Sequence, residues 1–177
     1  MMFFLETERL KLIPLTHDLL QLCNQNRPEM EARLGLTTNV MKISQEYVTE
    51  IQYAMAHFWL PQTAAHPDNY FWYTNWEIVL TSCNMAIGGI GFAGAPDDKG
   101  FAEIGFMLDE HFHGQGYAAE ALRAMINWAF GHEAVRHVVA RTYEDNAPCR
   151  RLLLGAGFMP VAADGRLLTY RKCRPVM

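Results

Sequence analysis

Residues 101–121 read FAEIGFMLDEHFHGQGYAAEA, and this stretch decides the fold. Its first eight residues alternate between two sets of largely apolar side chains, as expected for a strand that is covered on both faces. From Gly116 the apolar spacing becomes that of a helix, which ends at Gly131. Between these two elements lies the glycine-rich segment His113-Gly114-Gln115-Gly116-Tyr117-Ala118. The stretch therefore predicts a strand, a turn and a helix.

The glycine-rich segment has the chemistry of an anion site. The first N–H groups of a helix have no internal partners, and the helix dipole places partial positive charge there. Gly114 and Gly116 allow a phosphate to approach these amides, and the small side chains of Ala118 and Ala119 keep the first turn open. This pattern indicates a ligand with a pyrophosphate. A glycine-rich turn that merely starts a helix is the alternative.

Two other nucleotide-binding motifs fit this segment less well. The lysine and the serine or threonine of a P-loop are missing. The spacing Gly114-x-Gly116-x-x-Ala119 fits a dinucleotide fingerprint, with Glu144 after a second strand. However, residues 109–113 separate the strand from the first glycine, and too little chain follows for a doubly wound sheet. An NAD(P)-binding oxidoreductase is therefore the less favoured alternative.

Three segments together carry a family pattern. Residues 113–118 fit Q/R-x-x-G-x-G/A through Gly116 and Ala118, with His113 at the first position. Residues 6–15, ETERLKLIPL, are similar to ETERLxLRPL, with Ile13 in place of arginine. Residues 146–158 are similar to NxxS…LxxxGF, with Cys149 in place of serine. These segments resemble the GNAT superfamily of acetyl-CoA-dependent N-acetyltransferases, in the branch typified by ribosomal-protein alanine N-acetyltransferases.

The resemblance covers most of the chain and is weakest over residues 29–75. It implies one GNAT domain over residues 1–177, of class α/β (α+β), with a twisted, mixed, mostly antiparallel sheet and helices on both faces. It implies acetyl-CoA as the acetyl donor and no metal. The residues that it assigns to acetyl-CoA are Met107, Leu108, His113, Gly114, Gln115, Gly116, Tyr117, Ala118 and Asn146.

Acetyl transfer to an amine needs a base and a donor for the oxyanion. Glu103 is the candidate base, because a carboxylate among apolar strand residues tends to have a raised pKa, and the resemblance assigns the same role. The alternative is a Glu103 that pairs with a nearby arginine or reaches solvent at a sheet edge. The resemblance implies that a backbone amide near Leu108 stabilises the oxyanion.

The departing thiolate benefits from a proton donor. Cys149 is one candidate, with a pKa that its place at a helix N-terminus would lower, and Tyr143 is another. A covalent route through Cys149, assisted by His111 or His113, is the alternative mechanism, but the resemblance implies direct transfer.

The composition excludes several other classes. In 177 residues, 50% are apolar and 19% charged, which indicates a globular protein. The net charge of −4 argues against nucleic acid as a partner. The four cysteines lack zinc spacing and are expected to be reduced thiols in the cytoplasm. No stretch reaches transmembrane length, and the N-terminus lacks the pattern of a signal peptide.

The sequence leaves the acceptor amine open between a protein N-terminus and a small molecule. Four acidic residues would favour a cationic substrate, although such residues are usually solvated: Glu29, Glu31, Glu46 and Glu50. Homodimers are common in the family. A GNAT-fold module that binds acyl-CoA without turnover is the non-enzymatic alternative.

The rest of the chain gives further structural expectations. Thr16, Ser44 and Asn146 are predicted to cap helices, and residues 61–68 to form a loop. The aromatic residues within 69–80 are more typical of a core than of a surface that stacks on substrate. Residues 137–143 are predicted to form a strand parallel to 101–108, and a hairpin is predicted to close the chain.

Overall fold

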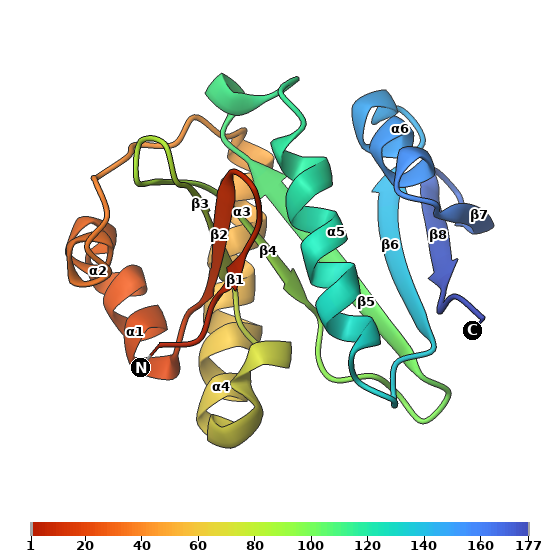
Figure 1. Cartoon of the computed structure of the whole chain (residues 1–177), viewed down its shortest axis with the longest axis horizontal. Helices are drawn as coiled ribbons and strands as arrows, with labels where there is room; N and C mark the ends of the chain where they lie inside the picture. Colours follow the sequence, from red (N-terminus) through yellow and green to blue (C-terminus); the bar gives the residue numbers. More distant parts are fainter. Residues whose placement is uncertain (1, 177) are drawn as a thin grey trace.

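Strand β5 (Phe101–Leu108) lies in the middle of an eight-stranded sheet in the computed structural model, which describes residues 2–176 (Figure 1). The strand order is β1-β2-β3-β4-β5-β6-β8-β7. The other strands are β1 (Leu5–Glu6), β2 (Leu10–Pro14), β3 (Trp76–Leu80), β4 (Met85–Phe92), β6 (His137–Tyr143), β7 (Met159–Asp164) and β8 (Leu167–Cys173). Only β5 and β6 pair in parallel, so the expected mixed and mostly antiparallel sheet is confirmed.

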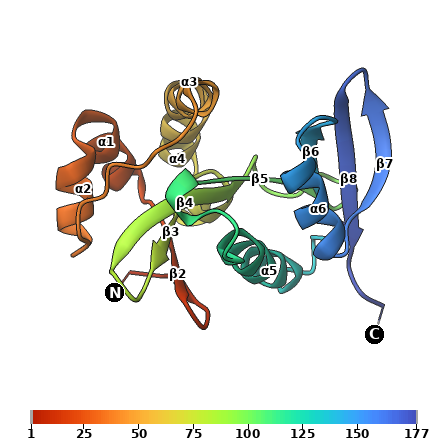
Figure 2. The same cartoon turned by 90° about the horizontal axis from the view of Figure 1, so that it is seen from above.

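Helices cover both faces of this sheet, as expected (Figures 1 and 2). Helices α5 and α6 pack on one face, and the segment from α1 to α4 covers the other face over β2–β5 (Figure 2). The helices are α1 (His17–Gln25), α2 (Arg27–Arg33), α3 (Gln45–Ala54), the π-helix η1 (Met55–Trp59), α4 (Leu60–Ala65), the 3-10 helices η2 (Pro67–Trp72) and η3 (Glu110–Phe112), α5 (Tyr117–Phe130) and α6 (Ala147–Gly155). Within residues 2–176, no helix has the length and apolar character needed to cross a membrane.

Side-chain caps fix where several helices begin. The side chain of Thr16 accepts a hydrogen bond from the Leu19 amide, and that of Ser44 accepts one from the Tyr47 amide. The side chain of Asn146 caps α6 in the same way, so all three predicted caps are confirmed. These caps set the positions of the helices that border the candidate site.

The aromatic segment before β3 belongs to the core. Trp72 and Trp76 are buried, and both rings contact Trp128 of α5, at centroid distances of 4.6 and 5.0 Å. Phe92 of β4 lies beside Trp72, with the centroids 5.0 Å apart. This aromatic cluster joins α5 to the sheet, which agrees with the predicted core role of Trp72 and Trp76.

The prediction of a loop over residues 61–68 is wrong. Residues Leu60–Ala65 form α4, which continues without a break from α3 and η1. Pro61 follows directly after the π-helix η1, where the regular i→i−4 hydrogen-bond pattern is already interrupted. The proline therefore does not end this helical segment, which runs on to cover the sheet.

Candidate active site

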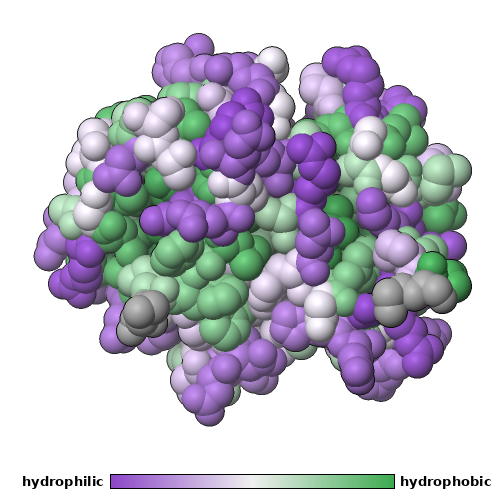
Figure 3. Space-filling model, viewed as in Figure 1, coloured by the Kyte–Doolittle hydropathy of each residue, from purple (hydrophilic) through white to green (hydrophobic). Residues whose placement is uncertain are grey.

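The sheet opens between β5 and β6. These strands pair only at Phe101–His137, Ala102–Val138 and Glu103–Val139. Beyond Glu103, β5 continues beside β4, whereas β6 continues beside β8. Figure 3 shows a notch at the upper edge of the molecule, between the side that carries α5 and the side that carries α6. We call the space between the diverging strands the wedge.

Backbone groups of β5 face this wedge. The Glu103 carbonyl accepts a hydrogen bond from the Ala93 amide at 2.8 Å, and the Asp109 amide donates to Ile87 at 2.8 Å. Because hydrogen bonding alternates along an antiparallel pair, the odd-numbered residues of β5 bond to β4. The even-numbered Phe106 and Leu108 therefore direct their N–H and C=O groups into the wedge. An N–H group in this position is available to a ligand.

His113 closes one of these groups. Its Nε2 lies 2.9 Å from the Leu108 carbonyl oxygen, and since a carbonyl only accepts, Nε2 carries the proton. His113, the residue that departs from the family pattern, thus holds the end of β5 through the Leu108 carbonyl and leaves the Leu108 amide free. Asp109, the next residue, is buried and caps η3 through its side chain. Burial pushes the pKa of Asp109 up, but hydrogen bonds from the His111 amide and the Asn39 side chain outweigh it and lower this pKa.

The glycine-rich loop ends at the first turn of α5 with its amides uncapped. Gly114 and Gly116 have φ of +75° and +83°, left-handed conformations that favour glycine. No described side chain caps α5 at Gly116, and a Cβ on Gly114 would meet no described atom within 4 Å. Gln115 is exposed, and Tyr117 and Ala118 are half-buried. These features support the anion site expected from the sequence.

Arg9 adds a positive charge to this loop, and the sequence pattern gave no sign of that role. Its Nε donates to Glu120 at 2.7 Å, and one terminal nitrogen donates to the Gln115 carbonyl at 2.9 Å. The guanidinium lies over the Tyr117 ring, 4.4 Å from its centroid. Its other terminal nitrogen would be 3.3 Å from a Cβ on Gly116. Arg9 therefore contacts Gln115, Tyr117 and Glu120, and its remaining terminal nitrogen lies beside the loop.

A cavity of about 550 Å³ lies between the sheet and the α1–α4 segment. Glu103, Gly105 and Met107 of β5 line it, together with the glycines of β4 and residues of α3 and η1. A second cavity of about 440 Å³ lies over β6–β8, and Glu103 and Arg141 border both. Glu103 is thus where the two cavities meet.

Glu103 is not enclosed by apolar side chains as expected. Its surroundings match the alternative, in which it pairs with a nearby arginine and reaches solvent. Its side chain is 37% exposed, and Glu103 Oε1 lies 3.7 Å from Arg141 Nε. The burial on which the expected pKa shift depends is therefore incomplete. The carboxylate faces the cavity beside the wedge, within reach of solvent and of a long, weak ion pair.

Cys149 lies at the start of α6, on the opposite side of the wedge. The Asn146 side chain accepts a hydrogen bond from the Cys149 amide at 3.2 Å. Burial raises the pKa of the thiol, although a hydrogen bond with Thr142 opposes this shift. The expectation of a lowered pKa at this helix N-terminus is wrong, because desolvation of the buried thiol raises the pKa. At neutral pH Cys149 is a thiol.

The remaining candidates for acid and nucleophile chemistry lie apart from Cys149. His111 bonds to Asp109 at 2.9 Å, and His113 bonds to Leu108, so both rings are engaged elsewhere. Tyr143 is 51% exposed at the end of β6. No described contact therefore assembles a nucleophilic Cys–His pair.

Tyr47 is a residue of the site that its sequence pattern did not reveal, because its spacing with Ile51 and Phe58 indicates only the apolar face of a helix. It lines the cavity. Burial raises the pKa of its hydroxyl, Cys149 raises it further, and the Asn146 side chain opposes this shift. Tyr47 is thus a polar group of the cavity wall whose pKa depends on residues at the start of α6.

No metal centre is formed by the described residues: within 2–176, no cluster of three or more His, Cys, Asp or Glu side chains has the arrangement that could hold an ion. The four cysteines are free thiols.

Comparison with known proteins identifies a family that the chain matches. The model of the acetyltransferase (GNAT) domain family matches residues 9–159. The N-acetyltransferase YjdG of Bacillus subtilis is 30% identical over 158 residues, which cover 89% of this chain and 90% of YjdG.

Two solved structures share the fold at low sequence identity. A RimL ribosomal-protein alpha-N-acetyltransferase in complex with coenzyme A has a TM-score of 0.67 at 18% identity, covering 97% of this chain and 98% of that one. The microcin self-immunity acetyltransferase MccE, in complex with acetyl-CoA and AMP, has a TM-score of 0.63 at 17% identity, covering 95% and 94%.

Proposed function

The chain belongs to the GNAT acetyltransferase family, whose members transfer acetyl groups from acetyl-CoA, and we propose that it acetylates a primary amine directly, with Glu103 as general base. The observation that carries this proposal is the wedge. It combines unpaired N–H groups of β5, an uncapped helix N-terminus and a carboxylate that opens onto a cavity.

Acetyl-CoA supplies an activated thioester, and the first turn of α5 would receive its pyrophosphate. The amides of Gln115, Gly116, Tyr117 and Ala118 are the proposed donors, with Arg9 as an additional cation. The chain of atoms next to the thioester would pair with the free edge of β5 at Phe106, as an added strand does, and this leaves the Leu108 N–H for the thioester oxygen. Asn146 and Met107 would border it on either side of the wedge.

The chemistry assigns one role to each group. Glu103 accepts a proton from the ammonium form of the substrate, and the neutral nitrogen then forms a bond to the thioester carbonyl carbon. The Leu108 N–H donates to the resulting oxyanion. When the carbon–sulfur bond breaks, Cys149, a thiol at neutral pH, gives its proton to the departing sulfur. The nitrogen loses its extra proton to solvent as the amide forms, and Cys149 regains a proton from solvent.

Calorimetric titration with acetyl-CoA, followed by an assay of free-thiol release with a panel of amines, tests the proposal. We expect saturable one-to-one binding and amine-dependent thiol release. Binding without release for any amine would contradict the enzyme proposal. Absence of binding, with quenching of protein fluorescence by NAD(P)H, would favour the oxidoreductase.

One observation favours a second candidate, a module that binds acyl-CoA without turnover. The ion pair between Glu103 and Arg141 engages the carboxylate that the reaction needs. At 3.7 Å and with both side chains partly exposed, this pair is weak enough to open, which favours the enzyme. The same assay distinguishes the two, because a module would bind acetyl-CoA and release no thiol.

A further inference from the structure

The cavity beside Glu103 is walled by apolar and aromatic side chains. Its volume of about 550 Å³ lies within the range of small-molecule sites, roughly 300–1,000 Å³. Four β-strand glycines flatten its floor: Gly88, Gly89, Gly91 and Gly105. Its walls include Tyr47, Ile51, Tyr53, Phe58, Trp59 and Met107. The shape and lining suit a compact apolar body.

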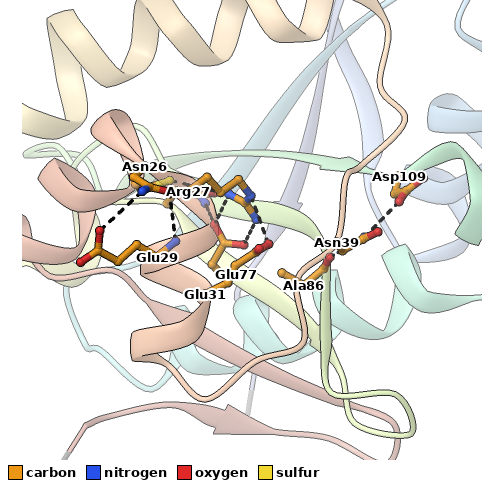
Figure 4. A network of polar contacts seen from close by, with 10 residues as sticks. Asn26, Arg27, Glu29, Glu31, Asn39, Glu77, Ala86 and Asp109 are labelled. Atoms are coloured by element: carbon orange, nitrogen blue, oxygen red, sulfur yellow. Dashed lines mark hydrogen bonds and ion pairs between the residues drawn. The ribbon is translucent and has the colours of Figure 1, made fainter.

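Both arginines of the lining already have carboxylate partners. Arg27 donates two hydrogen bonds to Glu77, at 3.1 and 2.7 Å, and Glu31 lies 3.4 Å from its Nε (Figure 4). Arg141 faces Glu103 at 3.7 Å. A substrate carboxylate or phosphate entering this cavity would therefore find Arg27 occupied, and it would have to compete with Glu103 for Arg141.

The remaining charge in the lining is negative. Glu50 of α3 lines the cavity and belongs to no ion pair among the described residues. With Glu77, Glu103, Arg27 and Arg141, it gives the lining three carboxylates against two guanidinium groups. This balance favours a substrate that arrives with an ammonium group.

The same cavity walls offer a peptide backbone few hydrogen-bond partners. The Asn75 side chain, a polar group of the lining, already donates to Glu77 at 3.0 Å. The hydroxyls of Tyr47 and Tyr53 also lie in the lining, but they are too few for the N–H and C=O groups of several peptide units. The lining thus discriminates between a polypeptide N-terminus and a small amine.

We propose that the acceptor is a small primary amine on an aromatic or aliphatic body that lacks a carboxylate or phosphate, with its nitrogen at Glu103 and its body against the aromatic wall. This inference rests on the proposed function for the transfer itself. It concerns what the cavity binds, which can be measured without turnover.

Binding to the protein saturated with coenzyme A tests the inference directly. Phenethylamine and phenylalanine differ by a single carboxylate, and a peptide amide with N-terminal alanine represents the polypeptide acceptor. We expect calorimetry to give phenethylamine an affinity about tenfold or more above that of the other two, because neither lost hydration nor unpaired amides oppose its entry. Equal or tighter binding of phenylalanine or the peptide would overturn the inference.

Thiol release with the same three compounds separates this inference from the proposed function. Selective binding of phenethylamine without thiol release for any amine would reject acetyl transfer and support the cavity assignment. Release with the peptide or phenylalanine at a higher kcat/KM than with phenethylamine would support acetyl transfer and overturn the substrate class.

Two pairs of variants locate the binding. Ala54 lines the cavity, whereas Ala56 is exposed and outside its lining, so Ala54→Trp should abolish phenethylamine binding and Ala56→Trp should not. Both variants should bind acetyl-CoA like the unmodified chain, which verifies folding. Equal effects of the two tryptophans on phenethylamine would overturn the inference.

The second pair tests the charge. Glu50→Gln should weaken phenethylamine about threefold to fivefold, the size expected for a partly exposed ion pair. Glu46→Gln, one turn earlier on α3 and outside the lining, is the matched control and should have a smaller effect, because its charge acts on the cavity only from beside Glu50. An equal loss in both variants, or no loss in either, would overturn the contribution of Glu50 to the binding of the ammonium group.

Discussion

Two Arg–Glu pairs border the same cavity and differ in almost every physical respect. The Arg27–Glu77 pair is tight, with two hydrogen bonds, and the Glu77 side chain is 1% exposed (Figure 4). The Arg141–Glu103 pair is long, at 3.7 Å, and the Glu103 side chain is 37% exposed. Both carboxylates project from strands, β3 and β5, onto the face of the sheet that the cavity occupies.

The difference separates a structural role from a chemical one. The Arg27–Glu77 pair is costly to separate, because Glu77 without Arg27 would be a buried, uncompensated charge. A half-exposed pair exchanges its partner for water at little cost. Glu77 is therefore held in place by its partner, whereas Glu103 can leave Arg141 and contact another group. The first two predictions set these carboxylates against each other.

The largest expected effect is that of Glu103→Gln on turnover. We expect kcat to fall about 10²–10⁴-fold, the usual contribution of a general base, because the amide cannot accept the proton. Acetyl-CoA affinity should change little, since the carboxylate lies on the acceptor side of β5. Thiol-release kinetics and calorimetry measure the two quantities. A parallel loss of both would contradict the base assignment.

Glu77→Gln should have the opposite profile. Removing one partner of a buried pair costs about 3–5 kcal/mol of unfolding free energy, measured by urea denaturation. Glu103→Gln is the matched control and should cost less than about 1 kcal/mol. Similar losses of stability in the two variants would remove the distinction between the pairs.

Gly116→Ala tests whether acetyl-CoA binding is sensitive to backbone strain in the glycine-rich loop before α5. A left-handed conformation costs a non-glycine residue about 1–2 kcal/mol, and the new Cβ would lie 3.3 Å from an Arg9 nitrogen. We expect acetyl-CoA affinity to fall about tenfold by calorimetry. Gly165→Ala, with φ of +58° in the β7–β8 turn, carries similar strain and should reduce stability alone. Unchanged affinity in Gly116→Ala would argue against this loop as the pyrophosphate site.

The smallest effect concerns Glu31, the second carboxylate beside Arg27. Burial raises its pKa above the unfolded value, and Arg27 only partly opposes this shift. Ionisation of Glu31 therefore disfavours the folded state. This destabilisation is absent at a pH below the pKa of Glu31 in the unfolded chain, and it is complete at a pH above its pKa in the folded chain. Glu31→Gln should raise the unfolding free energy at pH 7 by about 1 kcal/mol, a typical size for one substitution, and by much less at pH 4. A stabilisation that is larger at pH 4 would contradict the assigned direction.

The sequence predicted the elements whose signals are local. The period of two in β5, the glycines before α5 and the caps at Thr16, Ser44 and Asn146 depend on neighbouring residues, so a single sequence reveals them. The error at residues 61–68 has a local cause as well. A proline marks either a break or a first helical turn, and the helix that precedes Pro61 decides between them.

The site was predicted less completely, because its contacts join distant segments. Arg9 meets Glu120 across 111 residues, and Arg27 meets Glu77 across 50. No periodicity encodes such pairs. Even the pKa shift of Cys149 depends on how β6 and α6 bury it, which reverses the direction that its helix position suggests. The chemistry-bearing residues were therefore identifiable, but their environments were not.

The early divergence of β5 from β6 also has a consequence for amide hydrogen exchange. Phe106 and Leu108 belong to a central strand, yet their amides face the open wedge, while Gly105 and Met107 bond to β4. Deuterium uptake along this strand should therefore alternate between fast and slow at successive residues. A ligand that pairs with the free edge would slow only the fast members of that series. The exchange pattern of β5 would thus record, residue by residue, when the wedge is filled.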